Sequence, residues 1–139
     1  MKKNNYDDVI CIIPARGGSK GLPKKNLLKI DGEPLISRPI KHAIKSGVIG
    51  TILVSTDDEK IAKVAKKYGA KCIITSKHHK NGTDRICEAY KKINKKYDLV
   101  VDIQGDEPLI SPIHIDKVID FHFKSIGADI ILPNLKIPA

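Results

Sequence analysis

The chain has 139 residues, the length of a single domain, and its 41% hydrophobic content with a mean hydropathy of -0.21 excludes a disordered polar tract. No apolar run approaches the roughly 18 residues of a membrane helix and no signal-peptide pattern follows Met1, so we expect a soluble cytoplasmic protein without a membrane partner. The net charge of +9 favours anionic partners, but nearly all of the 25 basic residues are lysines and only 4% of residues are aromatic, which favours a nucleotide over a nucleic acid.

Five short runs rich in isoleucine and valine predict β-strands. Apolar and polar residues do not alternate in these runs, as they would in strands with one solvated face. A continuous apolar run is typical of strands buried on both faces of a parallel sheet. Amphipathic helical patterns separate them, as in βαβ units with right-handed crossovers. The predicted strands are Val9–Ile13, Thr51–Ser55, Lys71–Ile74, Leu99–Ile103 and Asp129–Leu132. The pattern predicts an α/β protein, a Rossmann-like three-layer sandwich with a mainly parallel sheet.

The loop after the first predicted strand combines glycines, a hydroxyl group and cations. It reads PARGGSKGLPKKN over residues 14–26. Glycines let the backbone approach a ligand, and Arg16, Ser19 and Lys25 add polar and cationic side chains, which is the chemical content of a polyphosphate cradle. Neither GxxxxGK[ST] nor GxGxxG occurs, which excludes the usual P-loop and dinucleotide motifs. The alternative is a glycine turn with solvated lysines.

One helical pattern precedes the second predicted strand and another follows it. Residues 35–46 give a less regular pattern because Pro39 lies inside it, so we expect a kink or a late start. After the strand, Thr56 and Glu59 have the spacing of a capping box. The apolar stripe of that second helix is Ile61, Val64, Ala65 and Tyr68.

The segment NGTDR, residues 81–85, precedes a third amphipathic helix. Its backbone amides and Thr83 lie at a helix start, which suits polar or anionic ligand atoms. The alternative is that Thr83 or Asp84 only caps the helix. The helix stripe is Ile86, Ala89, Tyr90 and Ile93. The adjacent His78 and His79 would point apart, so no metal pair is expected there.

A carboxylate follows the fourth predicted strand in the segment QGDEP, residues 104–108. Magnesium prefers one or two carboxylates together with phosphate oxygens, so Asp106 is the first candidate ligand and Asp102 a weaker one. The alternative is an ordinary acidic turn. A further helix is expected to start at Ser111 and Pro112. Because open parallel sheets bind ligands at the carboxyl ends of their strands, the loops after the first, third and fourth strands form the candidate site.

Together these motifs resemble the cytidylyltransferases that activate 3-deoxy-2-keto sugar acids as CMP derivatives, over nearly the whole chain. ARGGSKGLPKKNL is similar to the first motif of the acylneuraminate branch, although Gly21 stands where the 3-deoxy-manno-octulosonate (KDO) branch usually has a second arginine. HHKNGTDR and VDIQGDEPLI are similar to the KDO branch. The resemblance implies a fold of the nucleotide-diphospho-sugar transferase type, with residues 1–139 as its nucleotide-binding part. It places sugar-binding and dimerisation elements outside this chain and implies a homodimer for a longer one.

The resemblance also implies a reaction and the residues that carry it. CMP would be transferred from CTP to KDO with release of pyrophosphate; an acylneuraminate is the alternative substrate, and an inactive nucleotide-binding module is the alternative of another class. The expected catalytic residues are Arg16, Lys25 and Asp106, with Asp106 as the ligand of the cofactor Mg2+. The expected nucleotide-binding residues are Ala15, Arg16, Gly17, Gly18, Ser19, Lys25, Gly82, Thr83, Arg85 and Gln104.

Overall fold

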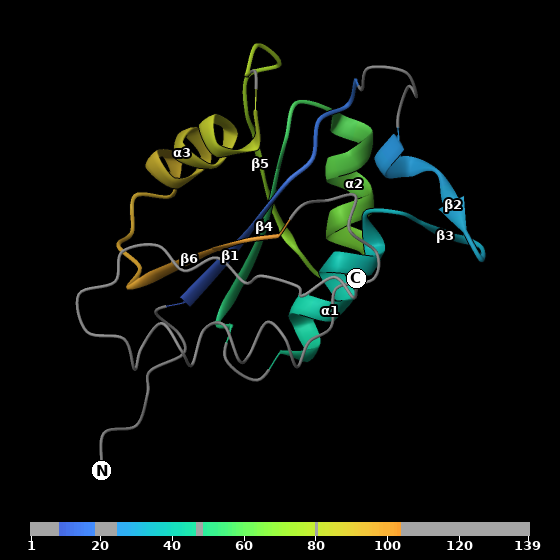
Figure 1. Ribbon diagram of the computed structural model, residues 1–139, viewed down its shortest axis with the longest axis horizontal. Helices are drawn as coiled ribbons and strands as arrows, with labels where there is room; N and C mark the ends of the chain where they lie inside the picture. Colours follow the sequence, from blue (N-terminus) through green and yellow to red (C-terminus); the bar gives the residue numbers. More distant parts are fainter. Residues whose placement is uncertain (1–8, 19–24, 47–48, 80, 104–139) are drawn as a thin grey trace, which may run out of the picture.

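The computed structural model describes residues 9–18, 25–46, 49–79 and 81–103, and within them a parallel sheet is covered by helices on both faces (Figure 1). The sheet has four strands in the order β5-β4-β1-β6, and every neighbouring pair is parallel. The strands are β1 (Val9–Pro14), β4 (Thr51–Thr56), β5 (Lys71–Ile74) and β6 (Leu99–Asp102). The predicted parallel sheet is confirmed; the fifth predicted strand, Asp129–Leu132, lies outside the described residues.

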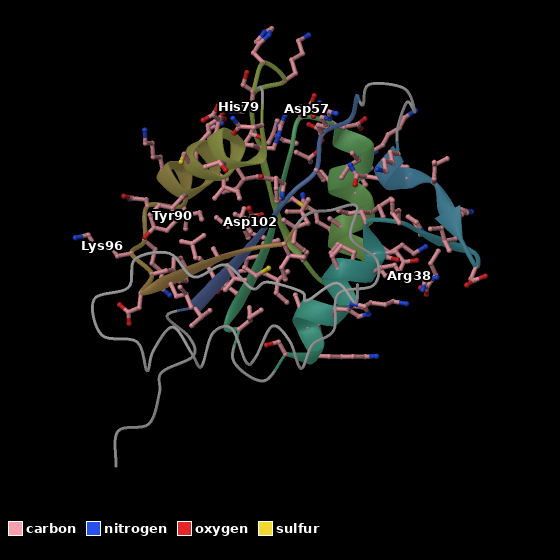
Figure 2. All side chains as sticks on the ribbon, viewed as in Figure 1. Arg38, Asp57, His79, Tyr90, Lys96 and Asp102 are labelled. Carbon is pink, nitrogen blue, oxygen red and sulfur yellow. The ribbon has the colours of Figure 1, made fainter. Side chains whose placement is uncertain are left out.

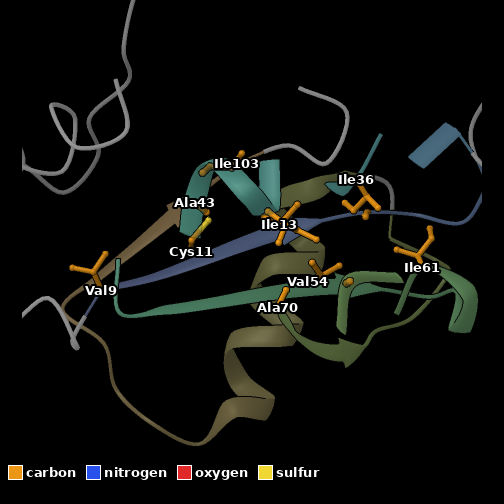
Figure 3. Close-up of a cluster of buried hydrophobic side chains, with 12 residues drawn as sticks. Val9, Cys11, Ile13, Ile36, Ala43, Val54, Ile61, Ala70 and Ile103 are labelled. Atoms are coloured by element: carbon orange, nitrogen blue, oxygen red, sulfur yellow. The ribbon is translucent and has the colours of Figure 1, made fainter. Parts of the chain in front are cut away.

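β1 is one of the two inner strands of this sheet and is buried along its whole length. The side chains of Val9, Cys11 and Ile13 belong to the apolar cluster on one face of the sheet (Figure 3), whereas Ile10 and Ile12 belong to the cluster on the other face. Successive side chains of a strand point to opposite faces, so a strand covered on both sides is apolar at every position. This explains the continuous apolar run in the sequence.

In the part of the chain that the structure describes, three helices cover the sheet. α1 (Ser37–Lys45) and α2 (Glu59–Lys67) pack on the face of Val9 and Ile13, and α3 (Gly82–Ile93) packs on the opposite face. The predicted apolar stripes of the second and third helices lie in these two clusters and are confirmed. No helix in the described part of the chain combines the length and apolar character needed to span a membrane.

The predicted late start of α1 is confirmed. The helix begins at Ser37, which places Pro39 in the first turn. A proline is tolerated there because the first N–H groups of a helix have no intrahelical acceptor. Pro39 is also buried, so its ring contributes to the core on this face of the sheet.

The predicted capping box at the start of α2 is wrong. Thr56 is the last residue of β4, and the cap is Asp58, whose side-chain oxygen accepts the Lys60 N–H at 2.7 Å. The Thr56 hydroxyl oxygen instead accepts the Asp58 N–H at 3.2 Å. Both residues are good caps, and the longer strand decides which one is used.

A small hairpin between β1 and α1 was not predicted. After the short 3-10 helix η2 (Lys25–Leu27), β2 (Lys29–Ile30) and β3 (Glu33–Pro34) pair antiparallel. The turn residues Asp31 and Gly32 both have positive φ, at 53° and 80°. An Asp-Gly pair is the sequence signal of such a hairpin, so this element was predictable.

Candidate functional site

The loops after β1, β4 and β5 lie side by side at the carboxyl edge of the sheet. Strand pairing continues one residue past the strand ends: the Ala15 N–H donates to the Ser55 carbonyl and the Thr75 N–H to the Thr56 carbonyl, both at 2.9 Å. Figure 2 shows Asp57 and His79 at this same end of the molecule. The predicted site included the loops after β1 and β5, and the structure adds the loop after β4.

The start of the loop after β1 is held by its main chain. The Gly17 N–H donates to Asp57 Oδ1 at 2.8 Å, and the Arg16 carbonyl accepts from Asn26 Nδ2 at 3.1 Å. The Arg16 side chain is exposed and Lys25, in η2, is half-buried. A fixed backbone with an exposed guanidinium is suited to binding an anion, because the cation is positioned before the ligand arrives.

The two adjacent glycines of this loop have different surroundings. A Cβ added at Gly17 would lie 2.7 Å from Oδ2 and 2.8 Å from Cβ of Asp58, the cap of α2. A Cβ added at Gly18 would meet nothing within 4 Å. Gly17 is therefore required by the packing of the protein itself, whereas Gly18 leaves open space beside the backbone.

Arg85, from the first turn of α3, points into the protein. Its side chain is only 4% exposed; Nη1 donates to the Thr75 hydroxyl at 2.7 Å and lies 3.9 Å from Asp57 Oδ1. Arg85 thus joins the loops after β4 and β5 to α3. Its described contacts are with protein groups, so its contact with a nucleotide stays a prediction.

The start of α3 is capped by Asn81. The Asn81 Oδ1 accepts the Asp84 N–H at 2.9 Å, so the alternative in which Thr83 or Asp84 is the cap is wrong. Thr83 is exposed and Gly82 half-buried at this helix start. Because the cap function is filled by another residue, the Thr83 hydroxyl is left for other partners, as a binding role requires.

Glu88 of α3 fixes the loop after β5, and the sequence analysis missed it. One carboxylate oxygen accepts the Ser76 N–H at 2.9 Å and lies 2.6 Å from His79 Nε2; the other lies 2.7 Å from Lys92 Nζ. Lys92, the Ser76 N–H and His79 together lower the pKa of Glu88 to about 2. A signal was available, since Glu88 and Lys92 have the i,i+4 spacing of a helical ion pair.

The predicted metal site is only partly within the described residues. Asp102, the weaker candidate, is exposed at the end of β6 and pairs in register with Ile12 of β1. An exposed carboxylate is the kind of group that binds a hard cation together with phosphate oxygens. Ser19, Gln104 and Asp106 lie outside the described residues. Among the residues that are described, no three His, Cys, Asp or Glu side chains are arranged to hold a metal ion.

Comparison with known proteins identifies relatives for most of the chain. Residues 10–133 match the sequence family described as Cytidylyltransferase. The chain is 47% identical to the 3-deoxy-manno-octulosonate cytidylyltransferase of Zea mays over 110 residues, which are 79% of this chain and 37% of that protein. It is 46% identical to the protein of the same name from Phocaeicola vulgatus over 109 residues, 78% of this chain and 42% of that protein.

A solved structure is also similar to this chain. It is a CMP:2-keto-3-deoxy-manno-octonic acid synthetase complexed with CTP, and it superposes with a TM-score of 0.80 at 33% sequence identity. The match covers 86% of this chain and 48% of that one. The predicted Rossmann-like nucleotidyltransferase fold is confirmed, and the chain spans less than half the length of these relatives.

Proposed function

The chain belongs to the cytidylyltransferase family, and on this premise we propose that it is the nucleotide-binding part of an enzyme that transfers CMP from CTP to a 3-deoxy-2-keto sugar acid. KDO is the proposed acid, because both curated relatives are named for it. The observation that carries the proposal is the loop after β1, where Arg16 and Gly17 are held by their main chain while the Arg16 side chain stays exposed. The remainder of a longer, homodimeric and cytoplasmic protein would supply the sugar site.

The proposed reaction is an in-line displacement at the α-phosphorus of CTP. The anomeric hydroxyl oxygen of the sugar acid forms the new O–P bond, the bond to the bridging β-phosphate oxygen breaks, pyrophosphate leaves, and the hydroxyl proton passes to solvent. Arg16 and Lys25 would neutralise the β- and γ-phosphates, with Ala15, Gly17, Gly18 and Ser19 approaching them through the backbone. Such a transfer needs positioning and charge stabilisation rather than a protein nucleophile.

The remaining predicted contacts complete this proposal. Gly82 and Thr83 at the start of α3 would contact cytosine or ribose, together with Arg85, and Gln104 would contact the nucleotide or the sugar. Asp106 would hold Mg2+, which when bound neutralises phosphate oxygens and so favours departure of pyrophosphate. Among the described residues, Asp102 at the end of β6 is the exposed carboxylate that precedes the QGDEP segment in the chain.

Two alternatives make different predictions. An acylneuraminate cytidylyltransferase would form product with N-acetylneuraminate instead of KDO, and the names of the curated relatives do not favour it. An inactive nucleotide-binding module would bind CTP and form no CMP-sugar at all. Product analysis with both acids therefore separates the three functions.

The decisive experiment measures pyrophosphate release and CMP-sugar formation by the protein that carries this chain, supplied with CTP, Mg2+ and either acid. We expect CMP-KDO from the unaltered protein and a loss of kcat/KM of at least about a hundredfold in Arg16→Ala, because the charge contact between the guanidinium and the phosphates is removed. Lys63→Ala removes one positive charge from an exposed position on α2 and is the matched control. Full activity of Arg16→Ala, or no CMP-KDO from the unaltered protein, would contradict the proposal.

A further inference from the structure

We propose that Asp57 is a positioning residue: it fixes the loop after β1 in the conformation that receives phosphate, while Arg85 compensates its charge. This inference rests on the proposed function and deepens it, because it concerns how the same site is prepared for its ligand. Asp57 follows β4, and sequence motifs alone gave it no function. The proposal depends on three contacts and one steric observation.

The first contact fixes the backbone of the loop. Asp57 Oδ1 accepts the Gly17 N–H at 2.8 Å, across 40 positions of sequence. Asp58 packs closely against Gly17, because an added Cβ at Gly17 would lie 2.8 Å from Cβ of Asp58. Asp57 therefore fixes the Gly17 N–H, while its neighbour Asp58 leaves no space for a side chain at this position.

The second feature is the charge of Asp57, the residue that holds the Gly17 N–H. A lone carboxylate beside a phosphate-binding loop would repel the ligand. Arg85 Nη1 lies 3.9 Å from Asp57 Oδ1, and the two side chains are only 4% and 17% exposed, so solvent screens the pair weakly. Arg85 is itself held by the Thr75 hydroxyl at 2.7 Å. Arg85 thus offsets the charge of Asp57, so Asp57 can hold the loop with little added repulsion of an anion.

These contacts predict an unusual order among variants of Asp57. Asp57→Asn keeps an oxygen acceptor for the Gly17 N–H and removes the negative charge, so we expect CTP affinity at least equal to that of the unaltered protein. Asp57→Ala removes the acceptor, and we expect CTP affinity to fall about tenfold, as for loss of a charge-assisted hydrogen bond. If Asp57 had only a structural role, the loss of CTP affinity in each variant would follow that variant's loss of unfolding free energy.

Arg85 provides a second, independent test. In Arg85→Met the Asp57 carboxylate loses its compensating charge, and we expect the affinity for tripolyphosphate, which has no base or ribose for Arg85 to contact, to fall about tenfold, with the loss shrinking at high salt. Adding Asp57→Asn to Arg85→Met removes the uncompensated charge, so tripolyphosphate affinity is expected to return to within about threefold of the unaltered protein. Such a rescue is expected only if Arg85 affects phosphate binding by compensating the negative charge of Asp57.

The experiment combines calorimetric titration with NMR on the protein that carries this chain. CTP and inorganic tripolyphosphate are the two ligands, and exchange of the Gly17 amide hydrogen reports the loop without any ligand. We expect faster Gly17 exchange in Asp57→Ala, near-normal exchange in Asp57→Asn, and parallel changes in affinity for both ligands. Glu59→Gln, which removes one negative charge from an exposed position two residues further on, is the matched control.

Unchanged Gly17 exchange and unchanged affinity in Asp57→Ala would overturn the positioning role. Equal weakening by Asp57→Asn and Asp57→Ala would also overturn it, since the acceptor would then be irrelevant. If the unaltered protein bound neither ligand, the proposed function would fail instead, and the Gly17 exchange rates would still decide whether Asp57 fixes the loop. The two failures are therefore distinguishable, and Asp57 belongs to neither apolar cluster, so its substitution leaves the packing of the core unchanged.

Discussion

Gly17 and Gly18 are adjacent in the sequence, yet a methyl group added to each meets a different environment. At Gly17 it would collide with Asp58, which also caps α2 through the Lys60 N–H. At Gly18 it would enter open space. Glycine is therefore required by the packing of the protein at position 17, whereas at position 18 it leaves space for the proposed ligand.

This contrast predicts opposite defects. Gly17→Ala is expected to lower the free energy of unfolding by about 1–3 kcal/mol, because overpacking forces Asp58 to shift. Gly18→Ala is expected to change the free energy of unfolding by less than about 0.5 kcal/mol, as for an uncrowded surface position, while weakening CTP binding. Chemical denaturation of both variants measures the free energy of unfolding, and calorimetric titration measures CTP binding. Equal stability losses would show that the crowding at Gly17 has no consequence.

At the scale of single residues, the sequence indicated the exposed members of the site and missed its internal supports. Arg16, Gly17 and Gly18 were predicted because glycines and cations in a loop after a strand have a recognisable chemistry. Asp57 was not, because its partner Gly17 lies 40 positions away and nothing local marks the contact. Contacts between residues far apart in the sequence depend on how the strands align, so they can be identified only from the structure.

At the scale of elements, Glu88 ties the loop after β5 to α3. Its pKa is lowered from 4.5 to about 2, so its stabilising effect is fully present above pH 4.5 and is lost as the pH falls through about 2. We expect Glu88→Gln to have a lower Tm than the unaltered protein at pH 6, and the difference to shrink steadily between pH 4.5 and 2. Thermal unfolding followed across this pH range tests the expectation.

The exposed Glu59 of α2 provides the control for this titration, because Glu59→Gln removes the same charge from a different helix. A Tm difference for Glu88→Gln that stayed constant down to pH 2 would contradict the linkage. His79 and Lys92 also face Glu88, so the variant removes a small network rather than one pair.

Strands were easier to predict than helix starts, for a physical reason. The four strands of the parallel sheet agree with the predicted ones to within one residue, because dense isoleucine and valine runs are required wherever both faces are buried. Helix starts depend on which of several polar residues turns toward the backbone. Thr56 and Asp58 were both suitable, and the extra residue of β4 gave the cap to Asp58.

At the scale of the whole molecule, β1 is buried along its whole length and contributes side chains to the apolar clusters on both faces of the sheet. Ile13→Ala is expected to cost about 2–5 kcal/mol of unfolding free energy, because the fully buried side chain leaves a cavity in the cluster beneath α1 and α2. Ile74→Ala in β5 makes the same truncation at a residue that is 41% exposed and should cost far less. Urea denaturation of both variants measures the difference; similar costs would contradict the central position of β1 in the core.

The strand order also has a consequence for how the chain is made. β1 is synthesised first, yet its two neighbours begin only at Thr51 and at Leu99. Until the second of these leaves the ribosome, the most apolar strand of the domain has an unpaired edge, and parallel pairings between distant segments form slowly. A nascent chain paused before Leu99 therefore presents a strand able to associate with other chains. A strand that lies inside the finished sheet therefore keeps one edge open until Leu99 and the residues after it have been made.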